Sequence, residues 1–258
     1  SIDTLLPDVH FPAAAPAHLI GYRALMVSFS DLAAMRASPR YCLVSLSIDD
    51  TQLALGSAWV VSLARGMADA ARDLGVYVCG GNLTRGPLNI AVSAHGEIEH
   101  QCLLRRSGGQ AGQQLSVTGR LGAAAACVRT GQMLPVDPAV LTPVQSAYYR
   151  PQARFDVLAM VETASAGLDI SDGLSQDLAH LCAASGCGAA LQAASIPLAA
   201  GATLEDALFG GDDYELLVAS DKPLPGAHTI GMLTAEPGLT LDGAPLASNG
   251  FDHFGTDQ

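Results

Sequence analysis

The sequence predicts a mixed α/β fold, with α+β character, that is divided into two domains. Apolar side chains recur at helical spacing in two segments, residues 22–32 and 60–74. Apolar runs typical of strands lie between and after these segments. A proline-rich stretch then interrupts the pattern, and helices and strands are predicted again in the second half.

The first half is predicted to begin with a short strand that carries Asp3. The helix at residues 22–32 is expected from the spacing of Tyr22, Leu25 and Phe29, and the helix at residues 60–74 carries charged residues on its opposite face. The strands of this half are expected at residues 41–48, 76–79, 88–97 and 114–119.

The domain junction is expected between residues 130 and 152. Periodicity fades there, and prolines stand at positions 135, 138, 143 and 151. This places an N-terminal domain at residues 1–129 and a C-terminal domain at residues 130–258. The second half is predicted to contain helices at 153–161 and around 174–182, and strands at 166–170, 215–219, 229–233 and 239–241.

Composition excludes several classes of function. Thirteen Lys and Arg against 25 Asp and Glu give a net charge of −12, with no basic run, which argues against nucleic acid or an anionic membrane as partner. The longest stretch of small and apolar residues, 121–128, is far shorter than the ~20 residues of a membrane span. The six cysteines form no C-x-x-C pair, so reduced thiols in a cytoplasm fit best.

Nucleotide chemistry, if present, has to proceed without a P-loop lysine. Lys222 is the only lysine, and it lies in a turn-like Asp-Lys-Pro segment. Aspartates at the ends of predicted elements are the candidates to bind Mg²⁺ instead, since Mg²⁺ takes carboxylates together with water and phosphate oxygens. A single aspartate at such a position is more simply explained as a helix cap or turn residue. Asp169 and Asp172 form the more specific pair, because an apolar strand delivers both to the start of a helix.

Two further segments have a functional and a plain interpretation. Residues 80–87, beginning Gly-Gly-Asn, follow an apolar strand and either expose amides that cradle a phosphate or form a hairpin turn. Arg105 and Arg106 either clamp phosphate oxygens or solubilise a loop.

Taken in order, eight motifs resemble the thiamine-monophosphate kinase family, which belongs to the aminoimidazole-ribonucleotide synthetase-like superfamily. The resemblance runs essentially from end to end. The motifs are Asp3-Thr4-Leu5 with His10-Phe11, Ser30-Asp31-Leu32-Ala33-Ala34-Met35, Gly80-Gly81-Asn82-Leu83-Thr84-Arg85-Gly86-Pro87, Arg106-Ser107-Gly108, Arg150-Pro151, Asp169-Ile170-Ser171-Asp172-Gly173-Leu174, Gly210-Gly211-Asp212-Asp213-Tyr214-Glu215-Leu216 and Gly250-Phe251-Asp252-His253-Phe254.

The resemblance implies a two-domain fold whose N-terminal domain binds ATP and Mg²⁺ and whose first sheet pairs with that of a second subunit in a homodimer. It implies a phosphotransferase that converts thiamine monophosphate and ATP into thiamine diphosphate and ADP. Carried over motif by motif, the metal ligands are Asp3, Asp31, Asp169 and Asp172, and the ATP contacts are Gly81, Asn82, Arg106 and Ser171. The thiamine-phosphate contacts are His10, Asp212 and Phe251. No general base is expected, because the acceptor phosphate is already largely dianionic near neutral pH.

The chain departs from the family pattern at several positions. A Gly-Asp-Asp segment that precedes the first strand in the family is not part of this sequence, Ile2 stands in place of Thr, and Asn82 in place of a ligand Asp. Arg36 replaces the Gly that follows Ala-Ala-Met, and Asp212 replaces Glu. These departures support a second hypothesis, a catalytically impaired or noncatalytic homologue that still binds nucleotide or thiamine phosphate.

Overall fold

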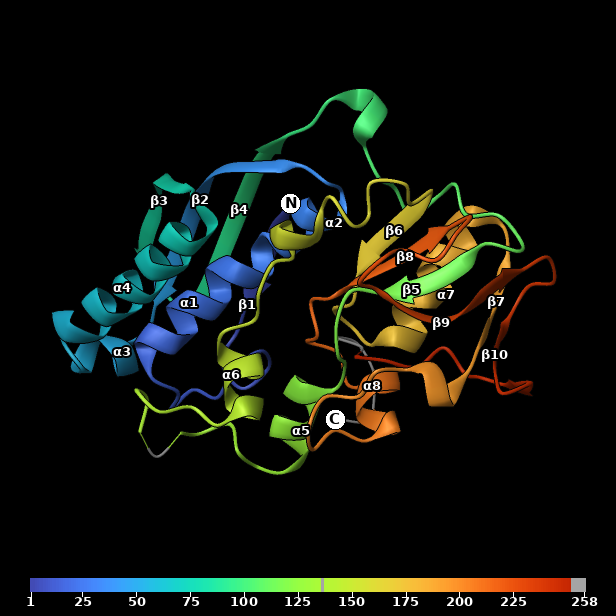
Figure 1. The fold of residues 1–258 in the computed structure, drawn as a ribbon. Helices are drawn as coiled ribbons and strands as arrows, with labels where there is room; N and C mark the ends of the chain where they lie inside the picture. The colour runs from blue at the N-terminus through green and yellow to red at the C-terminus, as the bar shows by residue number, and fades with distance from the viewer. Residues whose placement is uncertain (136, 252–258) are drawn as a thin grey trace.

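The computed structural model describes residues 1–135 and 137–251 and contains two β-sheets with helices packed on them (Figure 1). The prediction of a mixed α/β fold is confirmed. Residues 252–254 of the last motif lie outside the described residues.

The first sheet has four strands in the order β1-β4-β2-β3. Strand β4 runs antiparallel to both β1 and β2, whereas β2 and β3 are parallel. Strand β3 therefore forms one edge of the sheet, and β1 forms the other. The strands are β1 (Ile2–Leu5), β2 (Ser38–Ile48), β3 (Tyr77–Arg85) and β4 (Asn89–Glu97).

Two long helices, α1 (Ala17–Ser28) and α4 (Ser57–Leu74), pack against each other beside this sheet (Figure 1). Glycines let their backbones approach closely. A Cβ on Gly21 would lie 2.1 Å from the Leu63 carbonyl oxygen, and one on Gly66 would lie 1.9 Å from that of His18. A short helix, α3 (Asp50–Ala54), precedes α4.

The second sheet has seven strands in the order β11-β10-β7-β9-β5-β8-β6. Helix α7 (Leu174–Ser185) and helix α8 (Leu204–Phe209) bury apolar side chains against it in one core. The strands are β5 (Gln114–Val117), β6 (Ala166–Asp169), β7 (Gly188–Leu191), β8 (Leu216–Ser220), β9 (His228–Thr234), β10 (Leu239–Leu241) and β11 (Ala244–Pro245).

Three short helices connect the two halves. Helix α2 (Ser30–Ala34) follows α1 and contacts β6 of the second sheet. Helix α5 (Ala123–Arg129) contacts α8, and helix α6 (Pro143–Tyr149) contacts both α5 and α1. One-turn 3₁₀ helices lie at η1 (His100–Cys102), η2 (Phe155–Val157) and η3 (Ala193–Ser195).

Several sequence predictions need correction. The helix predicted at 153–161 is wrong, because only η2 and turns lie there. The hairpin turn, one of the two interpretations of residues 80–87, is also wrong, since β3 continues as a strand through Arg85. A side chain at Gly81 would place its Cβ 1.7 Å from the Val44 carbonyl oxygen of β2, so this glycine allows close strand contact. The segment 130–152, where periodicity fades, contains α6.

The predicted boundary at residues 129 and 130 stays a prediction. The strands themselves change sheet between Glu97 and Gln114, since β5 belongs to the second sheet. The core of the first sheet in turn includes Tyr148 and Tyr149, which follow that boundary.

Candidate active site

Three of the four predicted metal ligands come together where the two sheets meet. Asp3 lies on β1, Asp31 in the first turn of α2, and Asp169 at the end of β6. Burial and, next, the negative charge of Asp31 raise the pKa of both Asp3 and Asp169 above the ordinary aspartate value. We call these three residues the carboxylate cluster.

Asp169 is the most deeply buried member of the cluster, with 6% of its surface exposed. Its Oδ2 accepts a hydrogen bond of 2.6 Å from the hydroxyl of Ser30, which is fully buried on α2. Burial raises the pKa of Asp169 to about 7, and the Ser30 hydrogen bond opposes this shift. Burial thus favours the protonated form of Asp169 more than it would for an exposed aspartate.

The donor set of the carboxylate cluster fits a hard divalent cation. Within residues 1–135 and 137–251, no arginine, lysine or histidine forms an ion pair with Asp3, Asp31 or Asp169. A buried carboxylate without a cationic partner favours either a proton or a metal ion. Mg²⁺ binds carboxylate oxygens and completes its shell with water and phosphate.

The fourth predicted ligand, Asp172, lies in the loop after β6, beside a residue that the sequence analysis missed. Asp177 is 3% exposed, and one of its oxygens accepts the backbone N–H groups of Ser171, Asp172 and Gly173 at 3.0, 3.0 and 3.2 Å. Burial nevertheless raises the pKa of Asp177 to about 7. Ligand atoms of Asp172, Asp177 and His180 lie within 4.8 Å of one another.

The three predicted thiamine-phosphate contacts lie next to this loop. The backbone N–H of Asp212 donates to the Ser171 carbonyl at 2.8 Å, and that of Phe251 donates to the Asp172 carbonyl at 3.0 Å. The rings of Phe251 and His10 are 6.4 Å apart between centroids. We call His10, Asp212 and Phe251 the acceptor residues, because they are predicted to contact the thiamine phosphate, which is the phosphoryl acceptor.

A groove of about 350 Å³ adjoins Asp212. Ser146 on α6 and Arg150 just after its end form one wall, and Asp212, Asp213 and Glu215 lie along another part. Glu215 accepts a hydrogen bond from Thr118 and forms a close ion pair with Arg154. One oxygen of Asp213 accepts a hydrogen bond from the N–H of Gly122 at 2.7 Å. The other oxygen is buried without a partner in the described part of the chain.

The structure does not bring the remaining predicted residues to the carboxylate cluster within one chain. Gly81 and Asn82 lie on the exposed edge strand β3, and β4 and β2 stand between them and Asp3. Because neighbouring strands are ~4.8 Å apart, this separation is about 14 Å. Arg106 is exposed in the loop before β5, where its carbonyl accepts a hydrogen bond from Ser185 at 2.9 Å.

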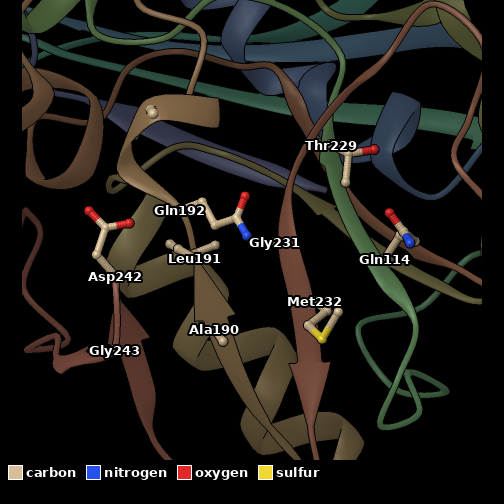
Figure 2. A pocket seen from close by; sticks show the side chains of 10 residues that line it. Gln114, Ala190, Leu191, Gln192, Thr229, Gly231, Met232, Asp242 and Gly243 are labelled. Carbon is tan, nitrogen blue, oxygen red and sulfur yellow. The ribbon is translucent and has the colours of Figure 1, made fainter.

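A second groove, of about 600 Å³, opens over strands β5, β7 and β9 (Figure 2). Figure 2 shows Gln192 and Asp242 on one side of it and Met232, Thr229 and Gln114 on the other. None of the predicted site residues lines this groove. The candidate active site is therefore the region between the two sheets.

Comparison with known proteins shows to which proteins the chain is related. Residues 1–98 match the family model of the AIR synthase related protein, N-terminal domain. The chain is 33% identical over 285 residues to thiamine-monophosphate kinase of Escherichia coli strain K12, covering 99% of this chain and 86% of that protein.

Solved structures of similar proteins also superpose on this chain. Thiamine-monophosphate kinase from Stenotrophomonas maltophilia K279a superposes with a TM-score of 0.85 at 31% identity, covering 95% of this chain and 85% of that one. AaThiL complexed with AMPPCP and TMP superposes with a TM-score of 0.89 at 29% identity, covering 98% of this chain and 86% of that one.

The match of residues 1–98 relates the N-terminal part of the chain to the AIR synthase related class. Within this class, the identity to the E. coli protein over nearly the whole chain decides the family. The chain belongs to the thiamine-monophosphate kinase family. The resemblance predicted from the ordered motifs is confirmed.

Proposed function

We propose that this protein transfers the γ-phosphoryl group of ATP to thiamine monophosphate, giving ADP and thiamine diphosphate. The observation that supports this most directly is that the loop after β6 links the two parts of the site. Asp169 of the carboxylate cluster precedes Ser171 and Asp172, whose carbonyls accept hydrogen bonds from the acceptor residues Asp212 and Phe251. A metal-bound donor and a phosphate acceptor would thus lie next to each other. The complex of AaThiL with AMPPCP and TMP, an ATP analogue and an acceptor phosphate, is in keeping with this proposal.

The carboxylate cluster would hold the magnesium that the family implies. Mg²⁺, when bound, neutralises the charge on the transferred phosphoryl group and orients it. Asp3, Asp31 and Asp169 would supply oxygens, with Asp172 as the further predicted ligand. The Ser30 hydroxyl would hold one oxygen of Asp169 and leave the other for the cation.

No side chain of this chain needs to remove a proton from the acceptor. The phosphate of a monoester is largely dianionic at neutral pH, so it can attack without a general base. The role of the acceptor residues is then to bind and orient the thiamine phosphate. Gly81, Asn82, Arg106 and Ser171 remain the proposed ATP contacts.

A homodimer is part of the proposal. The edge strand β3 is exposed along its whole length, and it carries Tyr77 and Leu83 with 76% and 63% of their surface exposed. An edge strand with unpaired backbone groups and large apolar side chains is usually covered. A second copy of the first sheet would cover it and would also bring a partner's surface toward β3.

No helix within the described residues is both long and apolar enough to cross a membrane, and a cytoplasmic location stays a prediction.

Release of ADP from Mg²⁺ and ATP, with and without thiamine monophosphate, tests the proposed function. We expect ADP release that depends on thiamine monophosphate and yields thiamine diphosphate in equal amount. The departures at Ile2, Arg36 and Asn82 favour the alternative of a noncatalytic homologue. Thermal stabilisation by ATP or thiamine monophosphate without any turnover would support that alternative and contradict the kinase proposal.

A further inference from the structure

Arg23 on α1 has a guanidinium group that is almost completely enclosed, with 2% of the residue exposed. Three of its nitrogens donate hydrogen bonds, and each goes to a different segment of the chain. Nη2 donates to Asp212 Oδ2 at 2.7 Å, Nη1 to the Tyr148 carbonyl at 2.7 Å, and Nε to the His10 carbonyl at 3.3 Å. The guanidinium also lies over the Tyr148 ring, 4.5 Å from its centroid.

Two of these three segments carry acceptor residues. His10 belongs to the loop after β1, and Asp212 to the loop before β8. The Tyr148 hydroxyl donates to the same His10 carbonyl at 3.1 Å. One buried side chain therefore connects two proposed thiamine-phosphate contacts that are 202 residues apart in the sequence.

Asp212 is held from both sides. Its Oδ2 accepts from Arg23, and its Oδ1 accepts from the Tyr214 hydroxyl at 2.8 Å. Among the described residues, Arg23 is the only cationic side chain that forms an ion pair with Asp212. We call Arg23 and Tyr214 the Asp212 clamp.

The backbone around Asp212 needs such a clamp. Asp212 and Tyr214 have φ angles of +62° and +52°, in the left-handed region that residues other than glycine seldom occupy. Residues in this region cost free energy and persist only where the surrounding contacts hold them. The N–H groups of Asp212 and Tyr214 donate to the carbonyls of Ser171 and Ile170, both at 2.8 Å, so these backbone bonds hold this loop against the segment after β6.

Lysine could not replace Arg23 in this role. The planar guanidinium presents several N–H groups in a fixed fork, whereas an ammonium is a compact point charge on a flexible stem. A lysine at position 23 could keep the charge opposite Asp212, but it could not hold all three segments in one geometry. The substitution Arg23→Lys therefore separates the effect of the positive charge from the effect of the guanidinium geometry.

We propose that Arg23, together with Tyr214, is a positioning residue for the thiamine-phosphate acceptor, because it fixes His10 and Asp212 relative to each other. This inference rests on the proposed function. Arg23 acts through the acceptor residues and is not itself a catalytic residue. Its removal is expected to weaken binding of the acceptor while leaving binding of Mg²⁺ and ATP unchanged.

The test compares Arg23→Lys with Arg129→Lys. Arg129 forms a forked ion pair with Asp206, which is 6% exposed, at 2.8 and 2.9 Å, and it also donates to the Gly201 carbonyl. Arg129 serves as the control because it also pairs with an aspartate and a backbone carbonyl but, being half exposed, contacts none of the acceptor residues. Steady-state kinetics give KM for thiamine monophosphate and for ATP separately. Thermal unfolding gives the Tm shift caused by each ligand.

We expect Arg23→Lys to raise KM for thiamine monophosphate at least about tenfold and to abolish the Tm shift caused by thiamine monophosphate, while KM for ATP changes less than about twofold. Arg129→Lys is expected to lower Tm without changing either KM. Tyr214→Phe, which removes only the second hydroxyl contact to Asp212, should raise KM for thiamine monophosphate to a smaller extent. If Arg23→Lys does not fold, the KM of Tyr214→Phe for thiamine monophosphate tests the inference instead.

Equal rises in both KM values, or an unchanged KM for thiamine monophosphate in Arg23→Lys, would overturn the inference. If Arg23→Lys does not fold, an unchanged KM in Tyr214→Phe would overturn it. Failure of the proposed function looks different, since the parent protein itself would then show neither turnover of thiamine monophosphate nor a Tm shift with it.

Discussion

The hydroxyl of Ser30 donates a 2.6 Å hydrogen bond to Oδ2 of Asp169, and this bond joins α2 to β6 across the junction of the two sheets. The two residues are 139 positions apart in the chain. Asp31 follows Ser30 directly, so the same bond fixes the spacing between the carboxylates of Asp31 and Asp169. The geometry of the carboxylate cluster therefore depends on contact between the two halves of the molecule.

Replacing Ser30 with Ala should weaken Mg²⁺ binding. The hydroxyl lowers the pKa of Asp169, so its loss leaves a buried carboxyl that is protonated more readily and competes less well for metal. Because a hydrogen bond to a charged group contributes about 1.5–3 kcal/mol, the Mg²⁺ concentration for half-maximal ADP release should rise about tenfold or more.

Ser116→Ala is the matched control for Ser30→Ala. Ser116 is also fully buried, and its hydroxyl pairs with Thr229 at 3.3 Å in the second sheet, away from the carboxylate cluster. This variant should leave the Mg²⁺ dependence unchanged. The same Mg²⁺ dependence in Ser30→Ala and the parent would remove Ser30 from the site.

Replacing Asp169 with Asn should abolish turnover with little loss of folding stability. Burial already disfavours the charged form of Asp169, so a neutral amide of nearly the same shape costs the fold little. Asp206→Asn provides the contrast, since it weakens the ion pair between the buried Asp206 and the half-exposed Arg129 and should lower stability. Turnover per folded molecule should persist in Asp206→Asn. Circular dichroism melts together with ADP release check both variants, and retained activity in Asp169→Asn would contradict its assignment.

The stability of the protein without metal should fall as pH rises between about 4 and 7. Burial raises the pKa of Asp169 from its ordinary 3.8 to about 7, so the folded chain binds more protons than the unfolded chain in this window. One whole proton of difference lowers the free energy of unfolding by about 1.4 kcal/mol for each pH unit. Asp177 contributes in the same direction, since burial raises its pKa to about 7 as well.

Urea unfolding of the parent and of Asp169→Asn across this pH window isolates the contribution of Asp169. The free energy of unfolding should fall less steeply with pH in the variant. The contribution of Asp206 to stability changes with pH in the opposite direction, because its bonds to Arg129 and Thr203 outweigh burial and lower its pKa. Its contribution is present above the ordinary pKa and is lost as pH falls. Identical pH slopes in the parent and Asp169→Asn would show that Asp169 is not the group that titrates.

The fold class, and the three aspartates that the structure gathers in the carboxylate cluster, could be predicted from sequence because their signals are local. Asp3, Asp31 and Asp169 each stand at or near the end of an element with a clear apolar pattern. The hairpin-turn interpretation of residues 80–87 was wrong because glycine is as useful for close strand contact as for a turn. Only the position of Val44 on the neighbouring strand distinguishes the two cases.

Other features depend on contacts that no local pattern reveals. Asp177 looks like an exposed helix residue in the sequence, but it accepts three N–H groups of the preceding loop. Arg23 lies in an apolar helix, and its partners come from residues far along the chain. A signal for α6 was present in Thr142, Pro143 and Gln145, which form a capping box with proline at the first turn. The four prolines of this region had instead suggested the domain junction.

The protein should be a dimer in solution, with a mass near twice the 26.4 kDa of one chain. Leu83→Lys places a charge on the exposed apolar edge strand and should shift the mass measured by light scattering toward that of one chain. Val140→Lys is the control, because Val140 is similarly exposed at 70% but lies in the loop before α6. A mass near that of one chain for the parent at micromolar concentration would contradict the dimer.

Arg36 provides a test of backbone strain at the end of α2. Its φ is +62°, its Nη2 donates to the Ala164 carbonyl at 2.7 Å, and its Nε is buried without a partner in the described part of the chain. The left-handed conformation costs a residue other than glycine about 1–2 kcal/mol. Arg36→Gly relieves this cost but loses the hydrogen bond, which contributes about 1 kcal/mol. Its stability should therefore be close to that of the parent.

The decisive comparison is between Arg36→Gly and Arg36→Ala. Both variants lose the contact with Ala164, but only Ala keeps the cost of the left-handed backbone. Gly should therefore be more stable than Ala by about 1 kcal/mol, the reverse of the usual order, in which Ala exceeds Gly by about 0.4–1 kcal/mol. Urea unfolding of the two variants measures this difference directly. If Ala is the more stable, residue 36 does not keep its positive φ, and the Gly found at this position in the family reflects something other than backbone strain.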